Sequence, residues 1–124
     1  MTINHLNLVV PDVDATANFF VKYFDFELQP TAVKYLAILH GGGDFVLVIS
    51  NFPNTPSYDY PKDFHIGFYQ PDHQAVDRLY DKLKEGITMD VAPRNIRDRY
   101  GFYFYAPGKV FIEITCPQHD IPHS

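Results

Sequence analysis

One motif occurs twice in the sequence, and this repeat restricts the fold more than any other feature. The stretch His5-Leu6-Asn7-Leu8-Val9-Val10-Pro11-Asp12 returns as His65-Ile66-Gly67-Phe68-Tyr69-Gln70-Pro71-Asp72, with histidine, proline and aspartate in the same places. Each copy reads as a strand that ends at a proline, followed by an aspartate that can cap a helix. A strand–turn–helix unit that occurs twice in one chain predicts an internal duplication.

The segments around the two copies predict the same order of elements, β-α-β-β-β. The first module covers about residues 3–50, residues 51–62 with Pro53, Pro56 and Pro61 form a linker, and the second module covers about residues 63–116. The tail from Pro117 is expected to fray. Helices are predicted to begin after Asp12 and Asp72 and to end near residues 24 and 86, and a polar loop is predicted at 93–100. Hydrophobic periodicity and turn residues predict strands at 3–10, 26–29, 33–39, 45–49, 64–69, 87–91, 102–105 and 110–115.

Length and composition narrow the class of protein. A chain of 124 residues fits a single domain, and its net charge of −5 argues against nucleic-acid binding. The one cysteine, Cys116, excludes an intramolecular disulfide and suits a reducing compartment. No apolar run approaches the roughly 18 residues of a membrane span, and no secretory signal precedes the first strand. We therefore expect a cytoplasmic protein with no membrane or nucleic-acid partner.

Alternation along the predicted strands places three metal-ligating residues on one face. The aliphatic residues of the first, middle and last strands should face the helices, which leaves His5, His65 and Glu113 on the opposite face. Two imidazoles and one carboxylate form a facial triad that keeps coordination positions open, suited to Mn, Ni, Zn, Co or Fe. The alternative is that each is an ordinary hydrogen-bonded or solvated strand residue. The other histidines, His40, His73, His119 and His123, are expected at the solvated surface.

The order of these elements and ligands resembles the vicinal oxygen chelate superfamily, which includes glyoxalases, bleomycin-resistance proteins and extradiol dioxygenases. The resemblance covers about residues 3–116 and is most specific at residues 4–12, 64–68 and 102–113. It implies an α+β fold in which two βαβββ modules form a U-shaped, partly open mixed β-sheet around a metal and substrate cavity. It also implies that residues 1–124 form one domain and that the protein is a homodimer.

Within that superfamily, the spacing of His5, His65 and Glu113 is most similar to that of the fosfomycin-resistance thiol transferases, and Tyr103 falls where they have a substrate-contacting tyrosine. The resemblance implies a metal-dependent enzyme that acts on a small oxygenated substrate through Lewis-acid catalysis, with Tyr103 as the catalytic residue. The loop arginines Arg94, Arg97 and Arg99 would contact an anionic group, and Tyr69 and Tyr105 would contact the substrate.

Departures from the family patterns limit the substrate. No lysine stands near Pro93, where the fosfomycin enzymes bind phosphonate, and residues 45–49 lack the fourth carboxylate ligand of glyoxalase I. No histidine precedes Tyr103 as it does in extradiol dioxygenases. We therefore expect neither efficient glyoxalase activity nor catechol cleavage. The alternative function is metal-free binding of a drug or metabolite in an aromatic cleft formed by Tyr35, Tyr69, Tyr103 and Tyr105.

Overall fold

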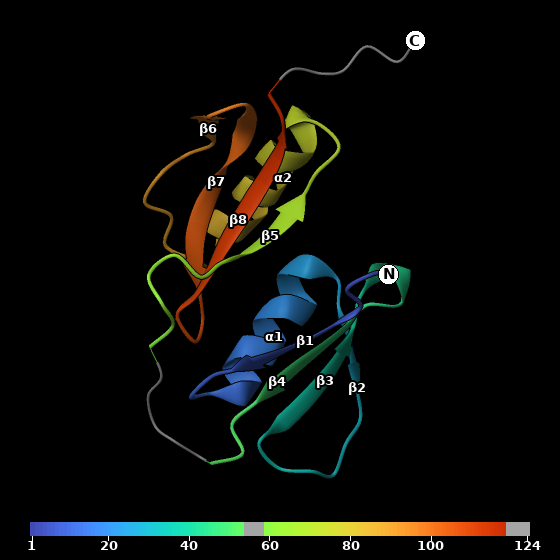
Figure 1. Cartoon of the computed structure of the whole chain (residues 1–124). Helices are drawn as coiled ribbons and strands as arrows, with labels where there is room; N and C mark the ends of the chain where they lie inside the picture. The colour runs from blue at the N-terminus through green and yellow to red at the C-terminus, as the bar shows by residue number, and fades with distance from the viewer. Residues whose placement is uncertain (54–58, 119–124) are drawn as a thin grey trace. The chain divides into compact units, whose positions relative to one another are not determined.

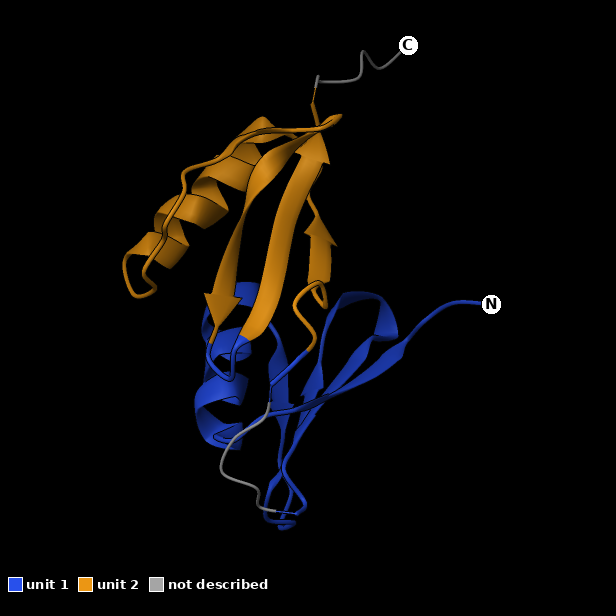
Figure 2. Cartoon of the chain, turned by 60° about the vertical axis from the view of Figure 1, so that its left-hand side comes forward, with its two compact units in different colours: residues 1–60, 107–109 blue, residues 61–106, 110–124 orange. Residues whose placement is uncertain are grey.

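The computed structural model describes residues 1–53 and 59–118, and it consists of two units that each combine one helix with a four-stranded sheet (Figure 1). Unit 1 comprises residues 1–60 and 107–109, and unit 2 comprises residues 61–106 and 110–124 (Figure 2). Both units have the element order β-α-β-β-β and a mixed sheet. The predicted α+β fold of two such modules is confirmed.

Unit 1 begins with the first copy of the repeated motif. Strand β1 (His5–Val9) pairs in parallel with β4 (Val46–Ser50), and antiparallel pairing gives the sheet order β1-β4-β3-β2. The Asp12 carboxylate accepts a hydrogen bond from the Ala15 N–H at 3.0 Å, so it is the helix cap that the sequence predicts. The remaining elements are α1 (Val13–Phe24), β2 (Glu27–Gln29), β3 (Leu36–His40) and a 3-10 turn (Gly42–Asp44).

The core of unit 1 lies between α1 and the aliphatic face of the sheet. Leu8 and Val10 are buried there, as alternation along β1 predicts. The sequence predicts a helix stripe of Val13, Ala17, Phe20 and Phe24, but Val13 and Phe24 are only half-buried. The buried face of α1 also contains Phe19, whose ring contacts those of Phe20 and Tyr23. The residues that α1 buries are Thr16, Ala17, Phe19, Phe20 and Tyr23.

Unit 2 has the same arrangement as unit 1, with its last strand in the interior of the sheet. Strand β8 (Val110–Pro117) pairs in parallel with β5 (Ile66–Tyr69) on one side and antiparallel with β7 (Arg99–Ala106) on the other. Strand β6 (Arg94–Ile96) pairs with β7, so the sheet order is β5-β8-β7-β6. Helix α2 (His73–Lys84) packs against β7 and β8 and is capped by Asp72. Tyr80 of α2 contacts Phe102, the pairing partner of Ile114, so α2 covers the face of the sheet that carries the fully buried Ile112 and Ile114. The alternate residues of β8 therefore lie on the opposite face of the sheet.

Two boundaries of unit 2 differ from the prediction. The predicted strand near residues 87–91 is wrong: no strand forms there, and β6 lies instead within the segment predicted to be a polar loop. Pairing of Arg94 with Gly101 and of Ile96 with Arg99 creates that strand, so a tertiary hairpin overrides local preference. The last strand also continues through Pro117, where the frayed tail was expected to begin.

The predictions for Pro56, His119, Pro122 and His123 lie outside the described residues.

His73 is not the solvated residue that the sequence predicts. Its Nε2 donates to the Gln118 carbonyl at 2.6 Å, and its ring stacks on Tyr100 with centroids 4.1 Å apart. The Tyr100 hydroxyl donates to the Asp77 carboxylate at 2.6 Å, which joins β7 to α2. This hydrogen bond, together with burial, raises the pKa of Tyr100 from 10.0 to about 12.

Replacing Tyr100 with phenylalanine should lower the free energy of unfolding by roughly 1 kcal/mol at neutral pH, because it removes this partly solvated bond. The folded state favours the neutral phenol, so the contribution is fully present below pH 10.0 and is lost as the pH rises towards about 12. Urea unfolding of both proteins at pH 7, 9 and 11 measures this. A stability difference that stays constant from pH 7 to pH 11 would contradict the assignment.

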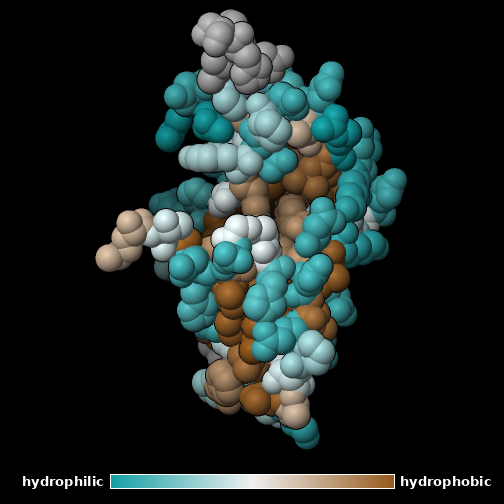
Figure 3. Space-filling model, turned by 90° about the vertical axis from the view of Figure 1, so that its right-hand side faces the viewer, coloured by the Kyte–Doolittle hydropathy of each residue, from teal (hydrophilic) through white to brown (hydrophobic). Residues whose placement is uncertain are grey.

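The surface combines polar and apolar residues, as Figure 3 shows for one face. In the described residues, no helix is both long enough and apolar enough to cross a membrane. Two of the exposed aromatic side chains, Tyr69 and Tyr105, are 76% and 59% exposed and lie on the face of the unit 2 sheet opposite α2. That face carries the candidate site.

Candidate functional site

Tyr103 and Glu113 occupy the centre of the open face of unit 2. The β7–β8 register pairs them directly, and Glu113 pairs on its other side with Gly67 of β5. Directly paired residues project from the same face of a sheet. The sequence left the register of this hairpin open, and the structure places the Tyr103 phenol on the same face as the predicted ligand.

His65 lies immediately before β5 and faces Glu113. Its Nδ1 is 2.9 Å from the Asp63 carbonyl, which can only accept, so Nδ1 carries the hydrogen of this bond. In the neutral ring, Nε2 then holds the lone pair, and it lies 3.8 Å from Glu113 Oε2. This distance is too long for a hydrogen bond. Two electron-pair donors thus face each other with space for a cation between them.

The spacing of these donors fits a shared metal ion. Metal–nitrogen and metal–oxygen distances near 2.0–2.2 Å place two donors of one ion roughly 3 to 4.2 Å apart, depending on the angle between them. The 3.8 Å between His65 Nε2 and Glu113 Oε2 falls within that range. The hydrogen bond from Nδ1 to a backbone carbonyl is also the usual outer support of a metal-bound histidine.

The structure brings His65, Glu113 and Tyr103 together within unit 2. His5 belongs to unit 1, where it begins β1 and is exposed. Among the described residues, no cluster of three or more histidine, cysteine, aspartate or glutamate side chains has the geometry to hold a metal ion. The assignment of His5 as a third ligand therefore stays a prediction.

A cavity of about 570 Å³ contains this constellation, and all of its lining residues belong to unit 2. Three basic side chains line it beside the site: Lys62, Arg97 and Arg99. Arg97 occupies the β6–β7 turn with φ of 56°, in the left-handed region. The other predicted substrate contacts, Arg94, Tyr69 and Tyr105, are not among the lining residues.

Phe111 is a structural part of the site that the sequence prediction missed. Its ring stacks on Tyr103 with centroids 5.4 Å apart and an interplanar angle of 11°, and it meets the His65 ring edge-on at 6.2 Å. Phe111 thus restricts the rotamers of both neighbours. Alternation along β8 already puts it on the Glu113 face, which was the available signal. The Asp63 carbonyl, in contrast, is a backbone group that no side-chain pattern indicates.

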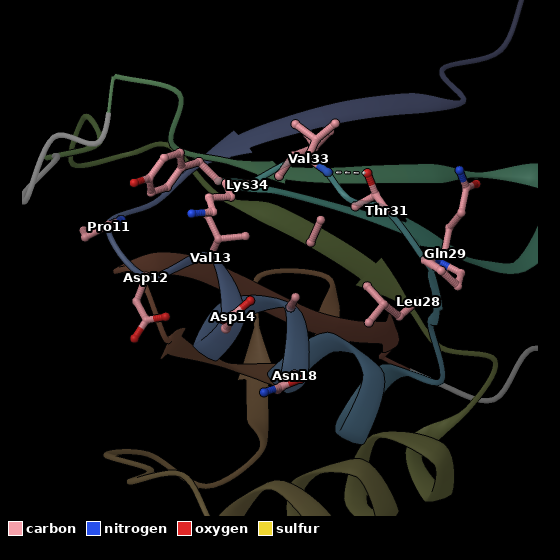
Figure 4. Close-up of a pocket in the computed structure, with 15 residues that line it drawn as sticks. Pro11, Asp12, Val13, Asp14, Asn18, Leu28, Gln29, Thr31, Val33 and Lys34 are labelled. Carbon is pink, nitrogen blue, oxygen red and sulfur yellow. Dashed lines mark hydrogen bonds between the residues drawn. The ribbon is translucent and has the colours of Figure 1, made fainter.

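A second hollow, of about 710 Å³, lies in unit 1 between the start of α1 and residues 28–37 (Figure 4). Its carboxylates are Asp12 and Asp14, and Asp12 already caps the helix. No histidine lines it, and neither do the residues that form the constellation in unit 2. The two hollows therefore share no lining residue.

Comparison with known proteins assigns the family. The model of the glyoxalase/bleomycin resistance protein/dioxygenase superfamily matches residues 2–114. The chain belongs to this superfamily. The resemblance stated from the sequence is thereby confirmed, although no curated protein matches the chain.

Several solved structures share the fold. A "possible glyoxalase" from Bacillus cereus is 35% identical, with a TM-score of 0.81 over 94% of this chain and 99% of that chain. The fosfomycin resistance protein FosX from Listeria monocytogenes is 20% identical, with a TM-score of 0.77 over 94% and 93%. Lactoylglutathione lyase from Agrobacterium tumefaciens is 17% identical, with a TM-score of 0.73 over 94% of each chain. The last two likenesses concern the fold alone.

Proposed function

We propose that this superfamily member is a divalent-metal-dependent enzyme that acts on a small oxygenated substrate. His65 and Glu113 are its proposed metal ligands, with His5 as the third. One observation mainly supports it: His65 Nε2 lies 3.8 Å from Glu113 Oε2 in a cavity that Tyr103 also lines.

Each residue of the site has a definable part in such chemistry. A bound metal would supply a Lewis acid that stabilises negative charge developing on a substrate oxygen. The Asp63 carbonyl holds the proton on Nδ1 of His65 and so keeps Nε2 free to act as a donor. Phe111 holds the Tyr103 ring beside Glu113, where the phenol can orient the substrate or exchange a proton with it.

The reaction class follows from the ligands that the chain offers. Strand β4 (Val46–Ser50) contains no carboxylate, and no histidine lies between Pro93 and Tyr103. We therefore expect addition or proton transfer on an epoxide, a hydroxy-ketone or a related metabolite rather than glyoxalase or ring-cleavage chemistry. The homodimer and the cytoplasmic location stay predictions.

Metal content and substrate range test this proposal. Protein purified without chelator or nickel resin should bind one divalent ion per chain when titrated with Mn, Co, Ni or Zn, as measured by elemental analysis after desalting. The loaded protein should turn over an epoxide or hydroxy-ketone faster than a hemithioacetal or a catechol. A protein that stays metal-free under all four conditions would refute the proposal.

A second candidate is metal-independent binding of a flat organic molecule, as in bleomycin-resistance proteins. Tyr105, which is 59% exposed, lies against Phe111 with ring centroids 4.7 Å apart and adds an accessible aromatic surface. The net charge of −5 would favour a cationic ligand. Tight binding of a cationic aromatic drug that a chelator leaves unchanged, without any turnover, would select this function instead.

A further inference from the structure

Arg99 lies across three strands of the unit 2 sheet. It starts from β7, its Nε donates to the hydroxyl of Thr115 on β8 at 2.9 Å, and its guanidinium lies over the Tyr69 ring of β5 at 4.2 Å from the ring centroid. The hydrogen bond to Thr115 restricts the position of the guanidinium, and the contact with the face of the Tyr69 ring restricts its tilt.

This fixed cation has no acidic partner among the described residues. The acidic side chains that lie within 4.0 Å of a basic group in that part of the chain are Glu113 beside His65, Asp81 beside Lys84 and Asp59 beside Lys109, and none of these three is a partner of Arg99. The bond to Thr115 uses only the Nε–H of Arg99, which leaves both terminal amino groups of the guanidinium as donors. Arg99 lines the same cavity as Glu113, so a free, oriented charge lies at the wall of the proposed site.

We infer that the substrate carries a carboxylate or phosphonate group and that Arg99 binds this group. The inference builds on the proposed function and names its substrate class. A guanidinium binds such oxyanions through two parallel hydrogen bonds, and its advance positioning lowers the entropic cost of binding. Tyr69, which the sequence predicts as a substrate contact, here serves as the platform that positions Arg99.

The position of Arg99 also limits the size of the substrate. Its anchor, Thr115, is two residues from Glu113 on β8, so these residues lie roughly 6.6 Å apart along one face. A compact molecule of a few carbon atoms can therefore place its anionic group at Arg99 and an oxygen near His65 and Glu113. Arg99 is thus a specificity-determining residue.

The test measures anion binding to the metal-free protein, so it does not depend on turnover. Methylphosphonate and acetate are titrated by NMR, with acetamide as the neutral analogue, into wild type, Arg99→Gln, Arg99→Lys and Thr115→Val. Arg78→Gln is the matched control, because it removes the same charge from an exposed position of α2 on the other side of the sheet.

We expect Arg99→Gln to weaken methylphosphonate binding about tenfold or more, with partial recovery in Arg99→Lys and an intermediate loss in Thr115→Val. Arg78→Gln should stay within about twofold of wild type. Equal affinity in wild type and Arg99→Gln, or acetamide binding as tight as acetate binding, would overturn the inference. Arg99-dependent anion binding in a protein that takes up no metal would support the inference while refuting the proposed function.

Discussion

Replacing Glu113 with glutamine should lower divalent-metal affinity about 100-fold or more and abolish turnover, while the fold survives. The amide keeps the shape of the side chain but removes the negative charge that faces His65 Nε2 at 3.8 Å. Glu113 is only partly buried, with a side-chain exposure of 23%, so the neutral amide remains solvated and thermal stability should change little. Isothermal titration with Mn and Zn, together with thermal unfolding, measures both effects.

Glu27→Gln is the matched control for this experiment. Glu27 lies exposed on β2 of unit 1, so the same chemical change there should leave metal affinity within about twofold of wild type. His65→Ala should reproduce the loss seen in Glu113→Gln, because it removes the facing donor. Undiminished affinity in both site variants would show that the metal binds elsewhere, and the proposed ligands would then be an ordinary surface pair.

Replacing Gly101 with alanine should have the largest effect on stability, about 3 kcal/mol or more, or should prevent folding. An added Cβ would clash with the Ile114 carbonyl oxygen and would lie 2.8 Å from the Thr115 Cα, both in the backbone of the inner strand β8. A backbone contact cannot be relieved by a rotamer change, so β7 and β8 would have to separate. Urea unfolding at neutral pH measures the cost.

The same sheet supplies the control, because Gly67 lies directly opposite Glu113 on the outer strand β5. A Cβ at Gly67 would meet only the Glu113 carbonyl oxygen, at an ordinary contact distance of 3.7 Å. Gly67→Ala should therefore change the free energy of unfolding by less than about 1 kcal/mol. Equal stability of the two alanine variants would show that the close approach of β7 to β8 is not required.

The repeated motif allowed much of the fold to be predicted, because each of its parts has a local physical cause. Asp12 and Asp72 cap helices through their own side chains, and strand alternation assigned the aliphatic faces that the helices cover. The strand at Arg94–Ile96 could not be predicted in this way. It exists because it pairs with β7, and its polar sequence has no alternating pattern.

The site was predictable to the extent that it depends on alternation. Alternation along the strands predicted that His65 and Glu113 share one face of the sheet, and it places Phe111 and Thr115 on that same face. Whether Tyr103 joins them depends on the hairpin register, which the sequence left open and which pairs Tyr103 with Glu113 in the structure. The orientation of His65 by the Asp63 carbonyl and of Arg99 by Thr115 depends on tertiary contacts, so it required the structure.

The strand order of each sheet has a consequence for biosynthesis. The strand made last in each unit, β4 or β8, lies between the strand made first and the rest of the sheet. While the nascent chain grows from its N-terminus, β1 therefore has no neighbour until Val46–Ser50 emerge from the ribosome. Strand β5 waits likewise for Val110–Pro117. Premature termination before β8 would leave β5 as an unpaired edge, the kind of strand that invites aggregation.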